Sequence, residues 1–313
     1  MTPLERAVTV AYGEVATVVS RTPSIYATSH PLTDVVVDVG GGRTVSLLQK
    51  DVATLLPGAD GSRPSFVRDP GREGRVYRRL LAEVDVGAPR LVGEGEGWLL
   101  LEKVPGVELY QVGDVGVWRV VAERVAAMHR AFSEWSSAEG GVEGAVHALG
   151  LLRHDAAAVD AWPARAAAAM ATPAQVRWLG ALQARYSEVR DRILSLPQTV
   201  LHGELYASNV IVSDVATPVA RVCPIDWEMA SAGAGLLDLA ALVAGAWSDA
   251  DRSAIAGPYL RAFPALGSVD LDVCRLHLAV QWLGWSPGWV APPAHAHAWL
   301  AEAQELSQRL GLL

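Results

Sequence analysis

The stretch Thr199–Asp214, TVLHGELYASNVIVSD, places a His and a Gly directly before an acid, Glu204. Five residues after that acid, Asn209 opens a short β-branched run, which predicts a strand. Another strand is predicted just before His202, so the polar residues between the two runs share a loop. An acid and an amide held in one loop are candidates for chemistry.

A second acid, Asp226, ends the next strand-like run, ARVCPID. A hairpin between NVIVS and ARVCPID would bring Asn209 and Asp226 together, because the two ends of a hairpin lie side by side. Carboxylate and amide oxygens are suitable ligands for Mg²⁺, so the pair predicts a metal site. The plainer alternative is that Asn209 only caps a turn.

The first third of the chain has the pattern of a small antiparallel sheet. Alternating and β-branched residues predict five strands, with a hairpin at Gly40–Gly42. The five runs are EVATVVSR, TDVVVDV, RTVSLLQK, PRLVGEG and GWLLLEKV. A helix, GREGRVYRRLLAEV, is predicted among them, with Val76, Leu80 and Val84 on one face. A capped helix with Thr2 as its N-cap is expected before them.

Lys50 ends the third of these strands, and Glu73 begins the helix that follows, where its carboxylate could pair with Lys50. Only two of the 26 basic residues are lysines, Lys50 and Lys103. A lysine in so arginine-rich a chain indicates a position that needs a compact ammonium rather than a planar guanidinium. A surface lysine and a solvated glutamate are the plainer alternatives.

Beyond Pro105 the periodicity becomes helical, with short strand candidates around TVLH, NVIVS and ARVCPID. We therefore expect an α+β fold of two lobes. Residues 1–104 would form a small antiparallel-sheet lobe, and residues 105–313 a large, mainly helical lobe that carries the Glu204 loop. A hinge is expected near 101–106.

Composition limits the class of protein. The chain has 313 residues, of which 51% are hydrophobic and 19% charged, as is typical of globular proteins. The net charge of −8 argues against nucleic acid and anionic membranes as partners. The longest apolar run, GLLDLAALVAGAW, carries Asp238 and predicts a buried helix rather than a membrane span. Cys223 and Cys274 give no disulfide framework, and no signal-peptide pattern is seen, so we expect a cytoplasmic protein.

Two segments, HGELYASNVIV and PIDWEMASAGAGLLDLAAL, resemble the catalytic loop and the metal-binding segment of the aminoglycoside phosphotransferase and choline kinase-like families, distant relatives of protein kinases. GREGRVYRRLL and WLLLEKVPGVEL resemble their first-lobe helix and hinge. The resemblance runs from about Val35 to Trp247 and implies a two-lobed protein kinase-like fold. It also implies a phosphotransferase that uses ATP or GTP with Mg²⁺ to phosphorylate a hydroxyl of a small molecule, such as an aminoglycoside, a sugar or another natural product. We expect a monomer or a weak homodimer.

The resemblance implies roles in nucleotide binding for two side chains and for the hinge. Lys50 would contact the α- and β-phosphates, and Glu73 would orient Lys50. The hinge from Glu102 to Val104 would offer backbone groups to adenine.

It implies further roles in the second lobe. Asn209 and Asp226 would hold magnesium, and Glu204 stands where the family has its catalytic Asp. His202 and Asp238 would support the loop of Glu204 through hydrogen bonds with its backbone.

Two features depart from the family pattern. Glu204 is one methylene longer than Asp, and the first-lobe phosphate loop, SRTPSIYATSHPLTD, has no glycine. Hydroxyls of Ser24, Thr28 and Ser29 are therefore the candidate phosphate contacts in that loop. The departures leave two alternatives open, a nucleotide-binding pseudokinase or scaffold, and non-kinase chemistry on the same fold.

A tryptophan cluster stands near the C-terminus, formed by Trp282, Trp285, Trp289 and Trp299. Such aromatic groups usually pack a core. The second interpretation is that the cluster forms a wall of the acceptor site.

Overall fold

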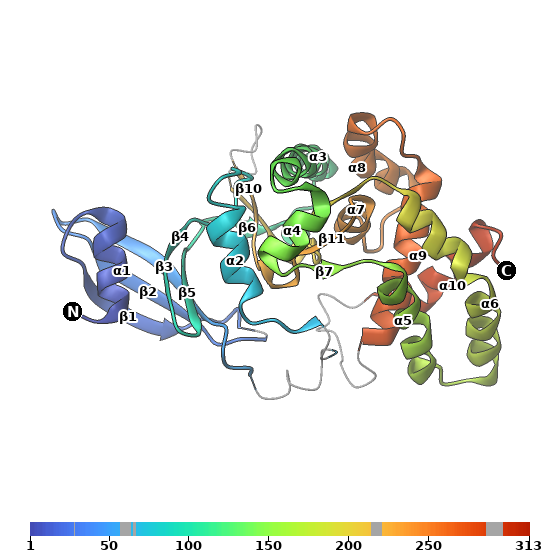
Figure 1. Cartoon of the computed structure of the whole chain (residues 1–313), viewed down its shortest axis with the longest axis horizontal. Helices are drawn as coiled ribbons and strands as arrows, with labels where there is room; N and C mark the ends of the chain where they lie inside the picture. Colours follow the sequence, from blue (N-terminus) through green and yellow to red (C-terminus); the bar gives the residue numbers. More distant parts are fainter. Residues whose placement is uncertain (28, 57–63, 65–66, 214–220, 286–296) are drawn as a thin grey trace.

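The computed structural model describes residues 1–27, 29–56, 64, 67–213, 221–285 and 297–313. The molecule is elongated, with a sheet and one helix at one end and most of the helices at the other (Figure 1). This arrangement confirms the predicted α+β architecture of a small sheet lobe and a large helical lobe. In the described ranges no helix combines the length and apolarity that crossing a membrane requires.

Helix α1 (Pro3–Tyr12) begins as the sequence predicts. The Glu5 amide donates to the Thr2 hydroxyl at 3.2 Å, and the Thr2 amide donates to the Glu5 carboxylate at 2.7 Å, which completes a capping box. Leu4 and Val8 are buried against the sheet in the core of the first lobe.

The five predicted strands form one antiparallel sheet in the order β1-β2-β3-β5-β4. They are β1 (Thr17–Pro23), β2 (Leu32–Asp38), β3 (Thr44–Asp51), β4 (Leu91–Gly95) and β5 (Trp98–Glu102). Because β3 is central, Lys50 lies between Leu32 and Leu99 of the neighbouring strands and is only 6% exposed. A buried ammonium needs anionic partners, which the sheet itself does not supply.

The second lobe is mainly helical. Its helices are α3 (Val115–Ala138), α4 (Gly141–Leu149), α5 (Ala156–Ala166), α6 (Pro173–Ser195), α7 (Leu236–Leu242), α8 (Asp249–Ala262), α9 (Ser268–Trp285) and α10 (Trp299–Arg309). Its strands are β6 (Val107–Glu108), β7 (Leu152–Arg153), β8 (Gln198–Leu201), β9 (Val210–Ser213), β10 (Arg221–Pro224) and β11 (Ser231–Ala234). The predicted β9–β10 hairpin is confirmed, with Val210 opposite Pro224.

Helix α2 (Arg72–Arg79) is shorter than predicted. The prediction continued this helix to Val84 and was wrong there. The Leu80 and Leu81 amides both donate to the carbonyl of Val76, so the regular i to i−4 ladder ends at this point. Leu80 is nevertheless fully buried, as its place on the apolar face predicted.

Helix α2 is fastened to the second lobe by Arg72, which is 3% exposed. Its guanidinium donates to the carbonyls of Gly150 at 2.9 Å, Glu228 at 2.8 Å and Val67 at 3.1 Å. Two of these acceptors belong to the helical lobe. The position of Glu73, the next residue along α2, is therefore set by both lobes.

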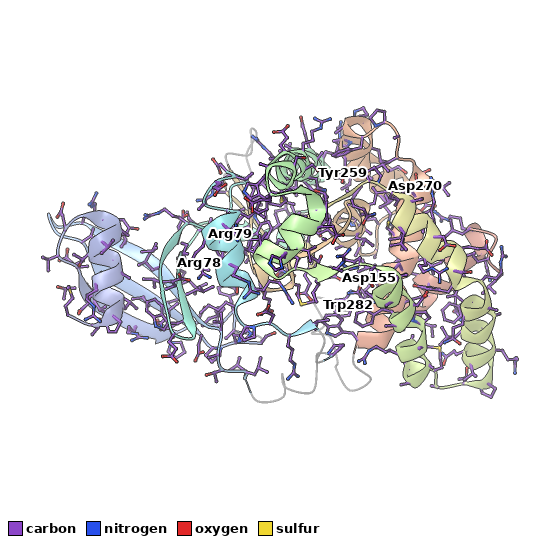
Figure 2. All side chains as sticks on the ribbon, viewed as in Figure 1. Arg78, Arg79, Asp155, Tyr259, Asp270 and Trp282 are labelled. Atoms are coloured by element: carbon purple, nitrogen blue, oxygen red, sulfur yellow. The ribbon has the colours of Figure 1, made fainter. Side chains whose placement is uncertain are left out.

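We predict that Arg72→Ala lowers the free energy of unfolding by about 2–4 kcal/mol, because it leaves buried carbonyls without a donor. Arg78 is the matched control on the same helix (Figure 2), since its side chain is 46% exposed and pairs with Glu94 at the surface. Arg78→Ala should cost less than about 1 kcal/mol. Urea unfolding of the three proteins measures both values, and equal losses would contradict the proposed fastening.

Candidate active site

The loop that carries Glu204 is anchored by Asp238, which lies on α7 and is 1% exposed. Its Oδ2 accepts from the amide of His202 at 2.7 Å, and its Oδ1 from the amide of Gly203 at 2.9 Å. His129 Nε2 lies 3.1 Å from Oδ2. Burial acts to raise the pKa of Asp238, but the bonds and charges of His129, His202 and Gly203 outweigh it and lower the pKa. Asp238 is thus held as a carboxylate.

Gly203 allows this loop to turn. Its φ is +88°, and a Cβ at this position would stand 2.0 Å from the carbonyl oxygen of Met229. No other residue type fits such a contact together with a left-handed backbone. The glycine before Glu204 is therefore required by the packing of the loop.

His202 is a support of the loop rather than a free base. Its Nε2 lies 2.8 Å from the carbonyl of Ile225, which can only accept, so Nε2 carries the proton. Its Nδ1 accepts from the amide of Glu204 at 3.3 Å. Burial lowers the pKa of His202, which favours this neutral form. The imidazole thereby ties the Glu204 loop to the residue that precedes Asp226.

Asn209 lies at the other end of the loop. Its side-chain nitrogen donates to the backbone carbonyl of Glu204 at 2.9 Å. Its own backbone carbonyl accepts from the amide of Ile225 at 2.9 Å. The β9–β10 hairpin therefore brings Asn209 next to the segment of Asp226, as the sequence pattern suggested. With its nitrogen used in this bond, the atom of Asn209 suited to a cation is Oδ1.

Lys50, Glu73 and Asp226 meet between the lobes. Lys50 Nζ lies 2.5 Å from Asp226 Oδ1 and 2.7 Å from Glu73 Oε2. The contact with Glu73 has poor hydrogen-bond directionality, so charge attraction holds it. Glu73 Oε1 also accepts from the amide of Trp227 at 3.2 Å. The lysine and both predicted acids are thus brought together from three separate elements.

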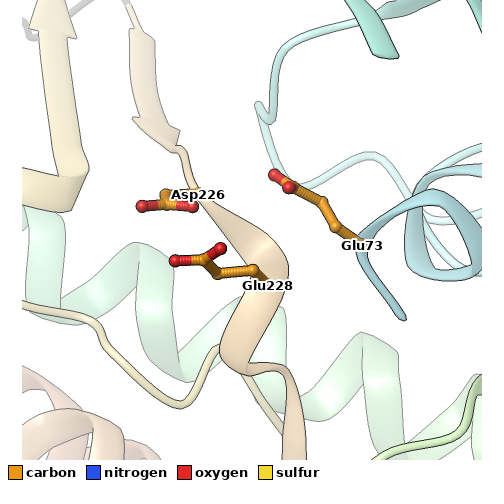
Figure 3. A group of neighbouring side chains, drawn as sticks. All are labelled: Glu73, Asp226 and Glu228. Carbon is orange, nitrogen blue, oxygen red and sulfur yellow. The ribbon is translucent and has the colours of Figure 1, made fainter. Parts of the chain in front are cut away.

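Glu228 joins this cluster. Carboxylate oxygens of Glu73, Asp226 and Glu228 lie within 4.8 Å of one another, with Glu73 facing the other two from α2 (Figure 3). Burial acts to lower the pKa of Lys50, but the three carboxylates outweigh it and hold that pKa well above its usual value. Burial and the neighbouring acids raise the pKa of Glu73, although Lys50 opposes the shift. Three carboxylates around one ammonium leave an excess of negative charge, and this oxygen-rich set fits Mg²⁺.

Asp226 has an unusual backbone. Its φ is +65°, and among the described residues it is the only one other than glycine with a positive φ. Aspartate and asparagine tolerate this left-handed conformation better than most residues. The turn points the Asp226 side chain at Lys50, while the next amide, that of Trp227, reaches Glu73. Such strain often marks a functional position.

Sequence reasoning missed His30, in the loop between β1 and β2. Its Nδ1 lies 2.7 Å from the carbonyl of Thr54, and its Nε2 lies 3.1 Å from Glu228 Oε2. The only available signal was a histidine in a phosphate loop without glycine. Glu228, two residues after Asp226, was not predicted as a site residue either.

The three hydroxyl residues predicted to contact phosphate in this loop differ in their surroundings. Ser24 is 7% exposed, and its Oγ is 3.5 Å from the amide of Tyr26, so it stabilises the base of the loop. Ser29 lies in the same loop, and its carbonyl accepts from Leu56. Thr28 is outside the described residues.

At the hinge, the Glu102 side chain is bound in a bidentate ion pair by Arg221 of β10, at 2.6 and 3.1 Å. The hydrogen bonds from Arg221 lower the pKa of Glu102. The amides of Glu102 and Lys103 already donate to the carbonyls of Arg90 at 2.9 Å and Ser46 at 3.3 Å, so neither amide is left for a nucleotide base. Val104 follows β5 and is half-buried, and Lys103 is exposed and pairs with Asp34 at 3.0 Å.

The tryptophan cluster contacts the Glu204 loop through Tyr206. Trp282 Nε1 donates to the Tyr206 hydroxyl at 2.6 Å, and Trp282 stacks on Trp299 at 5.3 Å between ring centroids. Trp285 stacks on Trp162 inside the lobe. Trp289 is outside the described residues. Core packing therefore accounts for part of the cluster, and Trp282 lies beside the candidate site.

A two-lobed fold with a buried lysine–glutamate pair, an aspartate beside that pair and a loop that carries an acid is typical of kinase-like proteins. Residues 59–275 match the model of the phosphotransferase enzyme family, and the chain belongs to that family. This confirms the suspected resemblance. No curated protein matches the sequence.

Solved structures share the fold across the whole chain. Choline kinase LicA from Streptococcus pneumoniae is 14% identical with a TM-score of 0.61, and 100% of each chain is covered. A putative fructosamine-3-kinase from Thermobifida fusca is 16% identical with a TM-score of 0.57 and 99% coverage of each. The GDP complex of aminoglycoside 2'-phosphotransferase-IIIa is 15% identical with a TM-score of 0.56, covering 99% of this chain and 98% of that one. These similarities confirm the kinase-like fold.

We predict that Asp238→Asn lowers the free energy of unfolding by about 2–4 kcal/mol at pH 7, because an amide replaces a buried carboxylate that faces several donors. The pKa of Asp238 is depressed in the fold, so its stabilising effect is present above the unfolded value of about 4 and is lost as pH falls through the folded value. The difference between wild type and variant should therefore shrink below about pH 4.

Urea unfolding at a series of pH values measures this difference. Asp191→Asn is the control, because that side chain is 67% exposed and its loss should change stability by less than about 0.5 kcal/mol. A difference that stays constant from pH 7 down to pH 3 would show that Asp238 is not held ionised.

Proposed function

We propose that this protein transfers the terminal phosphoryl group of ATP or GTP to a hydroxyl of a small molecule, an aminoglycoside, a sugar or another natural product. The observation that carries the proposal is the meeting of Lys50, Glu73 and Asp226 beside the loop of Glu204 and Asn209. Family membership and the kinase-like fold support it. Structural neighbours include complexes with GDP and with AMP, which supports a nucleotide as the donor.

The proposed nucleotide site lies between residues 1–104 and 105–313. Lys50 would bind the phosphates as a point charge, with Glu73 orienting it, and the backbone from Glu102 to Val104 would bind the base. Asp226 and Asn209 would hold Mg²⁺, which when bound neutralises charge on the phosphates. We further propose that the protein acts in the cytoplasm as a monomer or a weak homodimer.

Glu204 would position the acceptor hydroxyl and take up its proton. Hydrogen bonds hold the backbone of Glu204 on both sides of its Cα. Its amide donates to the imidazole of His202, and its carbonyl accepts from the side-chain amide of Asn209 and the backbone amide of Tyr206. The longer side chain is thus attached to a backbone with little freedom to move. We infer that the loop is built for the reach of a glutamate.

A nucleotide-binding pseudokinase is the second candidate. It is favoured by the 2.5 Å ion pair between Lys50 and Asp226, which joins the phosphate-binding cation directly to the metal-binding acid. In a kinase this pair must open when Mg²⁺ and nucleotide bind. In a scaffold it would persist, and nucleotide binding would not depend on magnesium.

We expect Mg-ATP or Mg-GTP to raise the melting temperature, because a ligand at about 100 times its Kd stabilises the folded state by about 2.7 kcal/mol. Asp226→Asn should remove the magnesium-dependent part of the shift. Lys50→Arg should lose most of the shift, because a planar guanidinium cannot take the place of the ammonium.

Arg185→Lys is the control for exchange between the two basic side chains, since Arg185 is 44% exposed on α6, outside the proposed site, and the variant should keep the full shift. A shift that is equal with and without magnesium would favour the pseudokinase. A full shift in Lys50→Arg would remove Lys50 from the phosphate site.

Both changes at Glu204 should slow transfer once an acceptor is known. Glu204→Asp should lower kcat about a hundredfold, because the carboxylate then falls roughly 1 Å short of the hydroxyl. Glu204→Gln should lower it further, because an amide cannot accept the proton. The acceptor is sought by screening hydroxylated and amino-sugar natural products for a nucleotide-dependent gain in mass.

The Kd for the nucleotide is the internal control for these two variants and should stay within about twofold of wild type. An unchanged kcat in Glu204→Gln would rule out this acid as the base.

A further inference from the structure

The loop between β1 and β2 spans residues 24–31 and contains no glycine. Backbone amides behind larger side chains approach a phosphate less closely than those of glycine. The loop nevertheless lies next to the buried cluster, because His30 contacts Glu228, which in turn contacts Lys50. The side chain of His30 is a group by which this loop contacts the cluster.

Both ring nitrogens of His30 face acceptors. Nδ1 lies 2.7 Å from the carbonyl of Thr54, and Nε2 lies 3.1 Å from the Glu228 carboxylate. A carbonyl and a carboxylate cannot donate, so a ring with a hydrogen on each nitrogen, the imidazolium form, satisfies both acceptors. Burial acts to lower the pKa of His30, but the bond and the charge of Glu228 outweigh it and raise the pKa. The bond to Thr54 also fixes the direction of the ring.

One anionic oxygen already lies between the two cations. Glu228 Oε2 is 3.1 Å from His30 Nε2 and 3.6 Å from Lys50 Nζ. A carboxylate oxygen in this position has the charge and the acceptor capacity of a phosphate oxygen. The space that Oε2 occupies therefore has the electrostatic character of a phosphate-oxygen site, bounded by an ammonium from β3 and an imidazolium from the loop.

We propose that His30 binds the phosphates of the nucleotide together with Lys50, with a phosphate oxygen taking the position now held by Glu228 Oε2. The imidazolium N–H would then do what glycine amides do in other phosphate loops. This inference rests on the proposed function, because it requires that the protein bind a nucleotide.

A purely structural role for His30 is the competing explanation, in which it only fastens the loop to Glu228. The two explanations predict different effects of a His30 substitution on the affinity for a nucleoside, which has no phosphates. A phosphate contact matters only for a ligand that has phosphates, whereas a loosened loop would weaken binding of the nucleoside as well.

The test compares the triphosphate that wild type binds, ATP or GTP with Mg²⁺, and the corresponding nucleoside, adenosine or guanosine. Calorimetry gives Kd for the triphosphate, and a ligand-observed NMR titration gives Kd for the nucleoside. His30→Ala should weaken the triphosphate about 10- to 100-fold, the usual effect of losing a hydrogen bond between charged groups. It should leave the nucleoside within about twofold of wild type.

Two further variants complete the experiment. His30→Gln keeps an N–H donor without the charge and should recover part of the lost triphosphate affinity. His147→Ala is the matched control, since His147 is an exposed histidine on α4 away from the site and should change neither affinity. In wild type labelled with ¹⁵N-histidine, the His30 imidazole signals should shift with the triphosphate and not with the nucleoside.

The outcomes separate the inference from the proposed function. If wild type binds neither triphosphate, both are overturned. If wild type binds and His30→Ala binds equally well, or loses triphosphate and nucleoside affinity in equal measure, only the role of His30 is overturned.

Discussion

A single buried ammonium sets the relation between the two lobes. Lys50 lies on the central strand of the first lobe and is almost fully enclosed, where an unpaired charge would be prohibitively costly. Its two closest acids come from different lobes, Glu73 from α2 and Asp226 from the end of β10. Both lobes therefore contribute a carboxylate to the same ammonium, so the docking of the lobes and the assembly of the site are coupled.

Hydrogen bonds to backbone groups then fix the parts that the ion cluster does not reach. Arg72 fastens α2 through carbonyls, and His202 joins the Glu204 loop to the strand end before Asp226. Asp238 holds the start of that loop by accepting from the amides of His202 and Gly203. The backbone around the site is thus held by contacts from several elements of both lobes.

The sequence predicted those parts of the structure that depend on local pattern. Alternation revealed the five strands, and the order of motifs placed Lys50, Glu73 and Asp226 in one site. The contacts of His30 with Glu228 and of Arg221 with Glu102 were not predicted, because they join residues far apart in the chain and leave no local periodicity. Arg72 could not be distinguished in a chain where nearly every basic residue is arginine. The end of α2 was misjudged because a residue on the apolar face, Leu80, is buried whether or not the helix continues.

The left-handed backbone of Asp226 determines which substitution can isolate its chemistry. One peptide turn aims its carboxylate at Lys50 and the following amide at Glu73, so the conformation matters to two contacts at once. Alanine would remove the charge and also disfavour the turn by about 1 kcal/mol or more, which would disturb Glu73 as well. Asparagine removes the charge while tolerating the same φ. An inactive protein made for trapping ligands should therefore carry asparagine at this position, because its cleft would keep the shape of the native one.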